Sequence, residues 1–232
     1  MIHSFLLIGQ SNMAGRGIIG EVPPINNKGI CLLKSGIWRP SFVPYHWDTD
    51  TAGIGLAESF ADAYRNDHPD VQVGLIPCAE GNTCLDQWMP GQPLYESALL
   101  QAKFAKETSQ IKGILWHQGE ADCKNHRYPL YEEKCTKILQ SFLKALDLDI
   151  PVIVGGLGEY LADCPLDKEL ANYIHVNAAL DSMANNNQNF GYVSSRGLSS
   201  NVDLLHFNAV SLREFGLRYY EVYKNMIKEM TL

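Results

Sequence analysis

The 232-residue sequence has no run of apolar residues near the 18 or so that a membrane-spanning helix requires. It is also poor in positive charge, because 19 Lys and Arg stand against 26 Asp and Glu and give a net charge of −7. That balance disfavours nucleic acid and other polyanions as partners. The first apolar segment begins within a few residues of Met1, which leaves no room for a signal peptide. We therefore expect a cytoplasmic protein without membrane or nucleic-acid partners, or a secreted one if the sequence is a processed form.

Cysteine is present but shows no metal-binding pattern. None of the six residues forms a C-x-x-C pair or a spacing typical of zinc sites: Cys31, Cys78, Cys84, Cys123, Cys135 and Cys164. In a chain of this length we expect reduced, mostly buried thiols, with one or two disulfides in an exported protein. A second group of residue types able to bind metal fits no zinc signature either: His117, Glu120, Asp122, Cys123 and His126. We predict no metal and no cofactor.

Two common enzyme motifs are missing. No serine stands in the Gly-x-Ser-x-Gly elbow of the α/β-hydrolases. Residues 15–20 match Gly-x-Gly-x-x-Gly, but this segment does not directly follow a strand, and it runs into Pro23 and Pro24 instead of opening a helix. The sequence therefore predicts neither an ordinary α/β-hydrolase nor a dinucleotide-binding protein.

The sequence does contain an alternation of buried strands and amphipathic helices. Apolar runs typical of buried strands lie at 5–8, 71–76, 111–116, 151–154 and 190–193. Helical spacing of apolar residues occurs at 52–65, 94–107, 131–146 and 212–226. This alternation favours a parallel sheet covered on both faces, and we predict a flavodoxin-like α/β/α sandwich of three layers and about five strands, in one domain over residues 1–232. Residues 21–50 show little periodicity, and we expect a long loop over the carboxyl edge of the sheet.

Ser11 directly follows the first predicted strand. The carboxyl ends of strands in an α/β sheet are where ligands bind, and a hydroxyl there has the rigid support that a nucleophile requires. Taken alone, a serine at this place is more typical of a helix cap. Asp203 and His206 follow the last predicted strand, three residues apart, so the carboxylate can reach Nδ1 of the imidazole and leave Nε2 for the serine proton. Together the three residues predict a catalytic triad at one edge of the sheet.

Two further strand ends carry groups that can donate hydrogen bonds to an oxyanion. Gln118 follows the strand at 111–116 and has an uncharged side-chain amide. Gly81 follows the strand at 71–76, and a glycine lets its backbone N–H approach a substrate closely. Polar groups at four strand ends thus predict acyl transfer.

Three segments resemble the sequence blocks of the SGNH (GDSL-type) hydrolase superfamily, and within it the branch that holds carbohydrate esterase family 6 and the sialate O-acetylesterases. They are residues 9–17 (GQSNMAGRG), 116–120 (WHQGE) and 203–207 (DLLHF). The resemblance implies a flavodoxin-like fold and metal-independent hydrolysis of acetyl esters on sugars.

The resemblance also implies a role for each residue of the predicted site. Ser11 corresponds to the nucleophile, whose own N–H contributes to the oxyanion hole, and His206 and Asp203 correspond to the general base and its orienting partner. Gly81 corresponds to the second oxyanion donor, and Gln118 to the third, where other SGNH enzymes have asparagine.

Two positions depart from this branch: Asn82, where a second glycine is usual, and Ser211, where glycine is common. We expect Asn82 to narrow the acyl pocket or to make it more polar. We expect Arg16 to form an ion pair behind the site with Glu120 or Asp122.

The sequence thus predicts a serine esterase that removes acetyl groups from small acetylated saccharides through an acyl-enzyme. The alternatives are an esterase for short-chain aryl, lipid or thioesters on the same triad, and a non-catalytic carbohydrate-binding protein. Three tryptophans either stack on sugar faces from the loops or cover the core: Trp38, Trp47 and Trp88.

Overall fold

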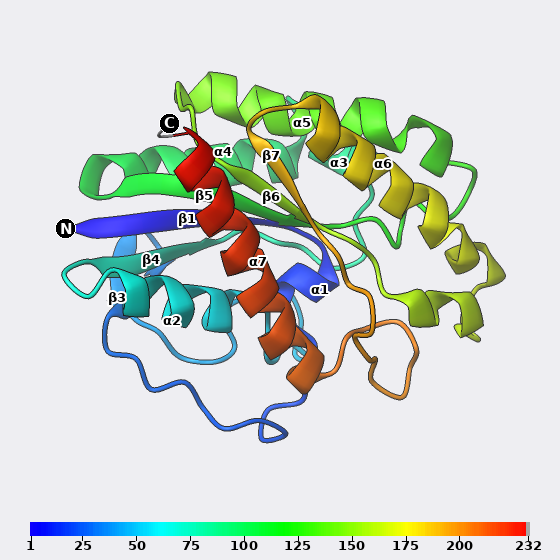
Figure 1. Ribbon diagram of the computed structural model, residues 1–232, viewed down its shortest axis with the longest axis horizontal. Helices are drawn as coiled ribbons and strands as arrows, with labels where there is room; N and C mark the ends of the chain where they lie inside the picture. Colours follow the sequence, from blue (N-terminus) through cyan, green and yellow to red (C-terminus); the bar gives the residue numbers. More distant parts are fainter. Residues whose placement is uncertain (231–232) are drawn as a thin grey trace.

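The computed structural model describes residues 1–230, and within them seven strands form one sheet (Figure 1). The strands are β1 (Ile2–Gly9), β2 (Ile30–Lys34), β3 (Ile37–Pro40), β4 (Gln72–Pro77), β5 (Gln110–His117), β6 (Val152–Gly155) and β7 (Phe190–Val193). Their order across the sheet is β3-β2-β4-β1-β5-β6-β7. All neighbouring pairs are parallel except β2 with β3.

The five strands expected from the sequence correspond to β1, β4, β5, β6 and β7. Their spatial order, β4-β1-β5-β6-β7, is the 2-1-3-4-5 order of flavodoxin-like sheets, so the predicted α/β fold is confirmed. In this order β4 lies on one side of β1 and β5 on the other. The connections therefore diverge at β1, and a crevice opens outside the carboxyl ends of these three strands.

The prediction of about five strands is too low, because part of segment 21–50 forms a hairpin. Strand β2 consists of the apolar run Ile30–Leu33 and Lys34, and it adds to the sheet beside β4. Ser35 and Gly36 connect it to β3, and both have positive φ, as a tight two-residue hairpin turn requires. The periodicity of a short hairpin at a sheet edge is too brief to stand out in the sequence.

Helices cover both faces of the sheet (Figure 1). The α-helices are α1 (Ser11–Ala14), α2 (Ala57–Asp67), α3 (Leu85–Trp88), α4 (Pro93–Thr108), α5 (Tyr131–Leu146), α6 (Tyr173–Asn186) and α7 (Ala209–Met230). Three short 3-10 helices lie between them: η1 (Tyr128–Leu130), η2 (Glu159–Asp163) and η3 (Lys168–Asn172). The predicted helix at 52–65 begins later than expected, because Ile54 pairs with Gly17 in an isolated bridge beside α1. No described helix is both long and apolar enough to span a membrane.

Side chains of β1 alternate between two hydrophobic clusters. Leu6 and Ile8 pack with residues of α4, α5 and α6, whereas Phe5 and Leu7 pack with residues of α2 and α7. This alternation follows from the two-residue period of a strand and explains why the run is apolar at every position. Because β1 is buried on both faces, the residues that follow it start from a rigid point.

Helices α2 and α7 approach each other closely at Gly216. A Cβ at this position would lie 2.0 Å from the carbonyl oxygen of Leu56 and 2.2 Å from Oγ of Ser59. Oγ of Ser59 in turn donates a hydrogen bond to the carbonyl oxygen of Arg213 at 2.7 Å. The contact leaves no space for a side chain at position 216.

We expect Gly216→Ala to destabilise the protein by about 1–3 kcal/mol, because the added methyl group must push α7 away from α2. Urea unfolding measures the change. Gly55→Ala is the matched control, since a Cβ there has its nearest neighbours at 3.5 Å, an ordinary contact distance. Equal midpoints for the two variants would contradict the prediction.

Candidate active site

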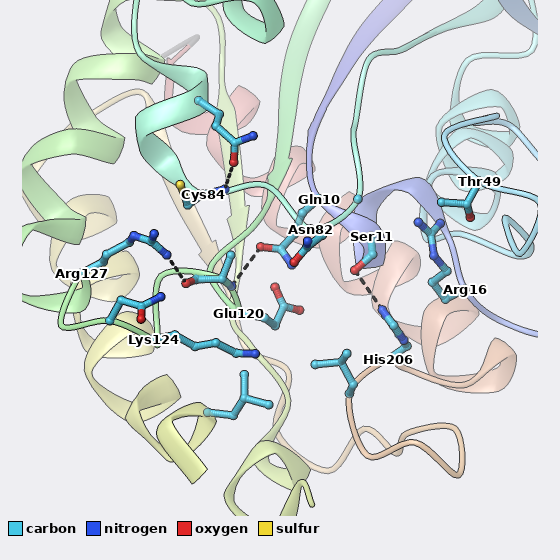
Figure 2. A pocket seen from close by; sticks show the side chains of 16 residues that line it. Gln10, Ser11, Arg16, Thr49, Asn82, Cys84, Glu120, Lys124, Arg127 and His206 are labelled. Carbon is cyan, nitrogen blue, oxygen red and sulfur yellow. Dashed lines mark hydrogen bonds between the residues drawn. The ribbon is translucent and has the colours of Figure 1, made fainter. Parts of the chain in front are cut away.

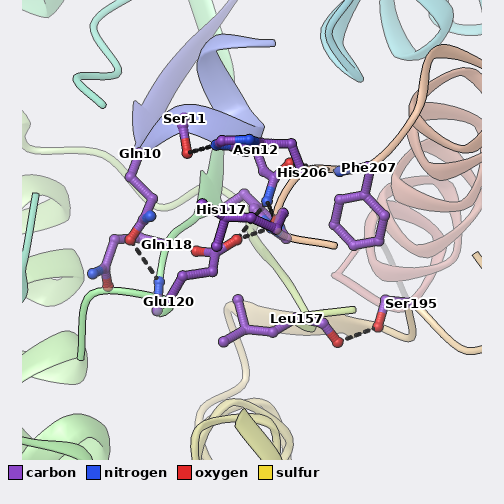
Figure 3. Close-up of polar contacts among 12 residues, drawn as sticks. Gln10, Ser11, Asn12, His117, Gln118, Glu120, Leu157, Ser195, His206 and Phe207 are labelled. Atoms are coloured by element: carbon purple, nitrogen blue, oxygen red, sulfur yellow. Dashed lines mark hydrogen bonds and ion pairs between the residues drawn. The ribbon is translucent and has the colours of Figure 1, made fainter. Parts of the chain in front are cut away.

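The residues predicted as a triad lie within hydrogen-bond distance of one another. Nε2 of His206 is 3.0 Å from Oγ of Ser11 (Figures 2 and 3). Nδ1 of the same ring is 2.7 Å from Oδ2 of Asp203. Ser11 is the first residue of α1 and is separated from β1 by Gln10 alone, while Asp203 and His206 lie in the loop before α7. This geometry allows His206 to take a proton from Ser11 while the carboxylate holds its ring.

The loop at 199–208 is folded tightly around Asp203. Its Oδ1 accepts the backbone N–H groups of Leu205 at 2.9 Å and His206 at 3.0 Å. Burial by itself raises the pKa of Asp203, but the hydrogen bonds from these N–H groups and from the imidazole outweigh it and leave the pKa below its ordinary value. The carboxylate therefore stays ionised and keeps both a backbone and a side-chain contact to the histidine. Ser211 supports the loop, since its Oγ accepts the N–H of Ser199 at 2.8 Å.

Asn12, which sequence analysis did not single out, connects the strand end to this loop. Its Nδ2 donates to Oε1 of Glu120 at 2.5 Å, and its Oδ1 accepts the N–H of Phe207 at 3.0 Å. The neighbours of Asn12 and Phe207 in the chain are Ser11 and His206, so this side chain bridges the two backbone segments that carry them (Figure 3). Its place inside the segment GQSNMAGRG was the available signal.

Glu120 is buried beside this bridge and lines the pocket. Burial raises its pKa, but the imidazole of His117, whose Nε2 lies 3.8 Å from Oε1, and the hydrogen bond from Asn12 leave the pKa lowered overall. Asp122 does not line the pocket. It accepts the N–H of Leu85 at 3.0 Å and the amide of Gln118 at 2.6 Å, and burial raises its pKa.

Arg16 does not pair with Glu120 or Asp122, and that prediction is wrong. Its guanidinium instead binds both oxygens of Asp48, at 3.2 and 2.5 Å, with both side chains almost fully buried. Asp48 lies in the segment 21–50, which the sequence suggested would cross this edge of the sheet. The sequence does not indicate the pairing of Arg16 with Asp48, because this pairing depends on where a loop without periodicity returns to the sheet.

The groups predicted to donate hydrogen bonds to an oxyanion differ in whether they already have an acceptor within the protein. The N–H of Ser11 has no acceptor among the described residues. The N–H of Gly81 lies near Ser11 but donates to Oδ2 of Asp48 at 3.0 Å. Gln118 is fully buried, and its Nε2 donates to the carbonyl oxygen of Thr83 at 3.0 Å as well as to Asp122. The amide of Gln118 is therefore committed to holding two loops together.

A cavity of about 570 Å³ opens beside Ser11 and His206 (Figure 2). Its wall consists of Gln10, Ser11, Arg16, Thr49, Gly81, Asn82, Cys84, Gln87, Glu120, Ala121, Lys124, Asn125, Arg127, Leu170, Leu205 and His206. Asn82 is exposed in this wall and has a positive φ of 57°. Most of the residues in this wall have polar or charged side chains, which can bind a hydroxyl-rich ligand.

The three tryptophans differ in their surroundings. Trp88 is fully buried against Trp116 and belongs to the core. Trp38 lies on β3, where its Nε1 donates to Thr108 at 2.9 Å. Trp47 is 42% exposed and lines a second cavity, of about 350 Å³, whose wall shares Asp48 with the ion pair beside Ser11. Of these three side chains only Trp47 is exposed, and Nζ of Lys34 lies over its ring at 3.7 Å from the centroid.

Removing one partner of the Arg16–Asp48 pair leaves the other charge buried and poorly compensated. We expect Asp48→Ala to destabilise the protein by about 3–5 kcal/mol, and the double variant Arg16→Met with Asp48→Ala to recover a large part of the loss. Urea unfolding of the single and double variants measures the coupling. Losses that simply add would show that the pair contributes no coupling energy.

Comparisons of the sequence with known proteins identify its family. A family model described as "Carbohydrate esterase, sialic acid-specific acetylesterase" matches residues 1–225. A probable carbohydrate esterase of Arabidopsis thaliana is 28% identical over 248 residues, which cover 94% of this chain and 89% of that protein.

Solved structures show the same fold. The crystal structure of the Arabidopsis thaliana protein superposes with a TM-score of 0.86 at 26% identity and covers 96% of this chain and 98% of its own. That of NanS has a TM-score of 0.77 at 16% identity and covers 98% of each chain. The chain therefore belongs to the carbohydrate esterase family of sialic acid-specific acetylesterases, an SGNH-type branch of carboxylic ester hydrolases that act on acetylated carbohydrates.

Proposed function

We propose that this protein removes O-acetyl groups from acetylated saccharides through a Ser-His-Asp triad and an acyl-enzyme. The observation that carries the proposal is the pair of hydrogen bonds that join Asp203 to His206 at 2.7 Å and His206 to Ser11 at 3.0 Å, at the wall of the cavity. The family of the chain supports acetyl esters of carbohydrates as the substrate class.

In the proposed mechanism Nε2 of His206 takes the proton of Ser11 as Oγ attacks the acetyl carbon. The C=O electron pair moves onto the oxygen, and the tetrahedral intermediate collapses when His206 returns the proton to the departing sugar hydroxyl. A water molecule then repeats the sequence on the acetyl-serine and releases acetate. Asp203 keeps the imidazole in the tautomer that leaves Nε2 free to accept a proton, and it stabilises the imidazolium that forms.

The lining of the cavity favours a short acyl group over a long one. Only three of the residues in its wall have aliphatic side chains, Ala121, Leu170 and Leu205, so few side chains are suited to hold a chain of many carbons. This favours an acetylesterase over the lipid esterase alternative. The hydrogen bonds that join Ser11 to His206 and His206 to Asp203 also favour an enzyme over a non-catalytic carbohydrate-binding protein.

We expect Ser11→Ala to reduce hydrolysis of p-nitrophenyl acetate to the buffer background, and Asp203→Asn to lower kcat by about 10³- to 10⁴-fold, because the amide cannot hold the same imidazole tautomer. Initial rates on acetate, butyrate and octanoate esters measure this, and the wild type should be fastest on acetate. Ser97→Ala and Asp70→Asn, at exposed positions away from the triad, are the matched controls. Wild-type activity in Ser11→Ala would refute the mechanism.

The charge of the cavity wall favours an acidic saccharide. Lys124 and Arg127 line the side of the cavity away from Ser11 (Figure 2). Lys124 also pairs with Asp167 at 3.2 Å, at a partly exposed position, and Arg127 donates to the carbonyl oxygen of Ala121 at 3.3 Å. Each cation retains donors for a carboxylate. The proposal that the substrate is an acetylated acidic sugar, such as a sialic acid, rests on these two residues and on the description of the family.

We expect Lys124→Met and Arg127→Met each to lower kcat/KM for an O-acetylated sialic acid by about 10- to 100-fold, the value of one lost charge-assisted hydrogen bond. Acetate release measures the rates, and acetylated xylose, which has no carboxylate, is the control substrate. The preference for the acidic sugar should also shrink as salt screens the exposed charges. Equal losses on both sugars would contradict the assignment.

A further inference from the structure

A separate cavity, of about 440 Å³, lies at the end of the sheet opposite to the triad. Its wall contains His3 from the start of β1 and Lys112 from the start of β5, whereas Ser11 lies beyond the other end of β1. The last turn of α2 and the second half of α7 supply the rest of the wall. Figure 1 shows the first residues of β1 and the last turns of α7 on the same side of the molecule, away from α1. The proposed mechanism does not use this cavity.

Lys112 reaches the cavity through a bulge in the pairing of β1 with β5. Ser4 and Phe5 are neighbours in the chain, but their partners on β5 are residues 111 and 113. Lys112 is therefore an extra residue without a counterpart on β1. Residues 112 and 113 both face α2 and α7, since Lys112 lines the cavity and a Cβ on Gly113 would lie 3.2 Å from the ring of Phe5. A regular strand would turn one of them to the opposite face, and bulges of this kind redirect a side chain at functional sites.

Positive charge gathers at this cavity, although the chain as a whole has a net charge of −7. Three lysines and two histidines line it against a single carboxylate: Lys112, Lys224, Lys228, His3, His68 and Asp67. Oδ2 of Asp67 already binds Nζ of Lys224 at 2.5 Å and the hydroxyl of Tyr220 at 2.8 Å. Lys112 forms no ion pair with a carboxylate of residues 1–230. A half-buried ammonium group without a counter-ion is stabilised by an anion from solution.

The imidazole of His3 lies among these cations. Its Nδ1 is 2.7 Å from the hydroxyl of Tyr64. Burial lowers the pKa of His3, and the positive charges of Lys112, His68 and the amino terminus lower it further. Cations thus act on this ring from β5, from the end of α2 and from the start of the chain. An anion bound among them would favour the protonated ring.

The remaining wall of the cavity is largely aromatic. Three tyrosines line it, each at most 4% exposed: Tyr64, Tyr220 and Tyr223. The ring of His68 stacks on that of Tyr64, with the centroids 4.2 Å apart and the planes 14° from parallel. A planar ring can pack on such aromatic side chains while its charged group faces a lysine. The volume of the cavity is within the range of sites that bind small organic molecules.

We propose that this cavity binds a small aromatic anion, a planar ring that carries a carboxylate or a phosphate group. Lys112 binds the charged group with His3 and His68 beside it, and the ring packs against the tyrosines of α2 and α7. The site is independent of the proposed function, because neither Ser11 nor His206 lines this cavity.

Isothermal titration calorimetry with phenyl phosphate and with benzoate tests the proposal. We expect saturable binding of one or both, with a Kd of about 1 mM or below. The tighter of the two identifies the charged group that the site prefers. Inorganic phosphate offers the charge without the ring, and benzyl alcohol offers the ring without the charge. Each should bind at least about 10-fold more weakly, because the site uses both parts of the ligand.

Variants locate the binding. Lys112→Met should raise the Kd by about 10- to 100-fold, the value of one lost charge-assisted hydrogen bond, whereas Lys112→Arg should retain most of the affinity. Lys103→Met, at an exposed position on α4, is the charge-matched control. Arg127→Met removes a cation from the catalytic cavity and should also leave the Kd unchanged. Thermal unfolding confirms that each variant is folded, and Lys112→Gln replaces Lys112→Met if the latter is not.

NMR titration of the histidines separates binding from a structural defect. Saturation of the wild type with the ligand should raise the pKa of His3, because a nearby negative charge favours the protonated ring. In the free protein Lys112→Met should also raise the pKa of His3, because a neighbouring cation is lost. The exposed His175 of α6 should keep its pKa in both experiments.

Three outcomes would overturn the proposal. The first is no saturable binding of phenyl phosphate or benzoate up to about 10 mM. The second is a Kd that is the same in the wild type and in a folded variant without the charge of Lys112, or a pKa of His3 that does not move on saturation. The third is inorganic phosphate that binds as tightly as phenyl phosphate, which would exclude a role for the aromatic wall.

Discussion

The site depends on one side chain that joins two distant parts of the chain. Asn12 binds Glu120 beyond β5 and the backbone of Phe207 before α7, from a position next to the serine. Without this bridge the loop at 199–208 would be tied to the end of β1 mainly by the contact of His206 with Ser11 and by the bond from Asn201 to the carbonyl oxygen of Arg16. The bridge is buried, so water does not compete for its hydrogen bonds.

Several charged side chains are buried at the same edge of the sheet. Arg16 and Asp48 form a nearly inaccessible pair, and Glu120 and Asp122 are buried at 3% and 2% exposure. Each of these carboxylates accepts hydrogen bonds from side chains or backbone N–H groups of another loop. Such contacts restrict the geometry of irregular loops that no periodic hydrogen bonding would otherwise hold, at the cost of desolvating the charges.

Much of this arrangement could be predicted from the sequence, because it follows from local patterns and chain order. The run at 5–8 is apolar at every position because both faces of β1 are covered, and the polar residues directly after it had to lie at the carboxyl edge. Residues 203 and 206 are close in the chain, so their contact needed only a turn. The hairpin of β2 and β3 was missed because two short strands at a sheet edge show too little periodicity.

The sequence by itself determined which chemical groups lie at the strand ends and at which edge of the sheet they meet. Only the tertiary structure decided which group each of them contacts. Arg16 binds Asp48 because the loop before α2 returns to that edge, a path that no local pattern specifies. Of two similar amides, Gln118 turns into the protein and Gln10 faces the cavity, because the direction of an amide depends on donors and acceptors that other strands supply.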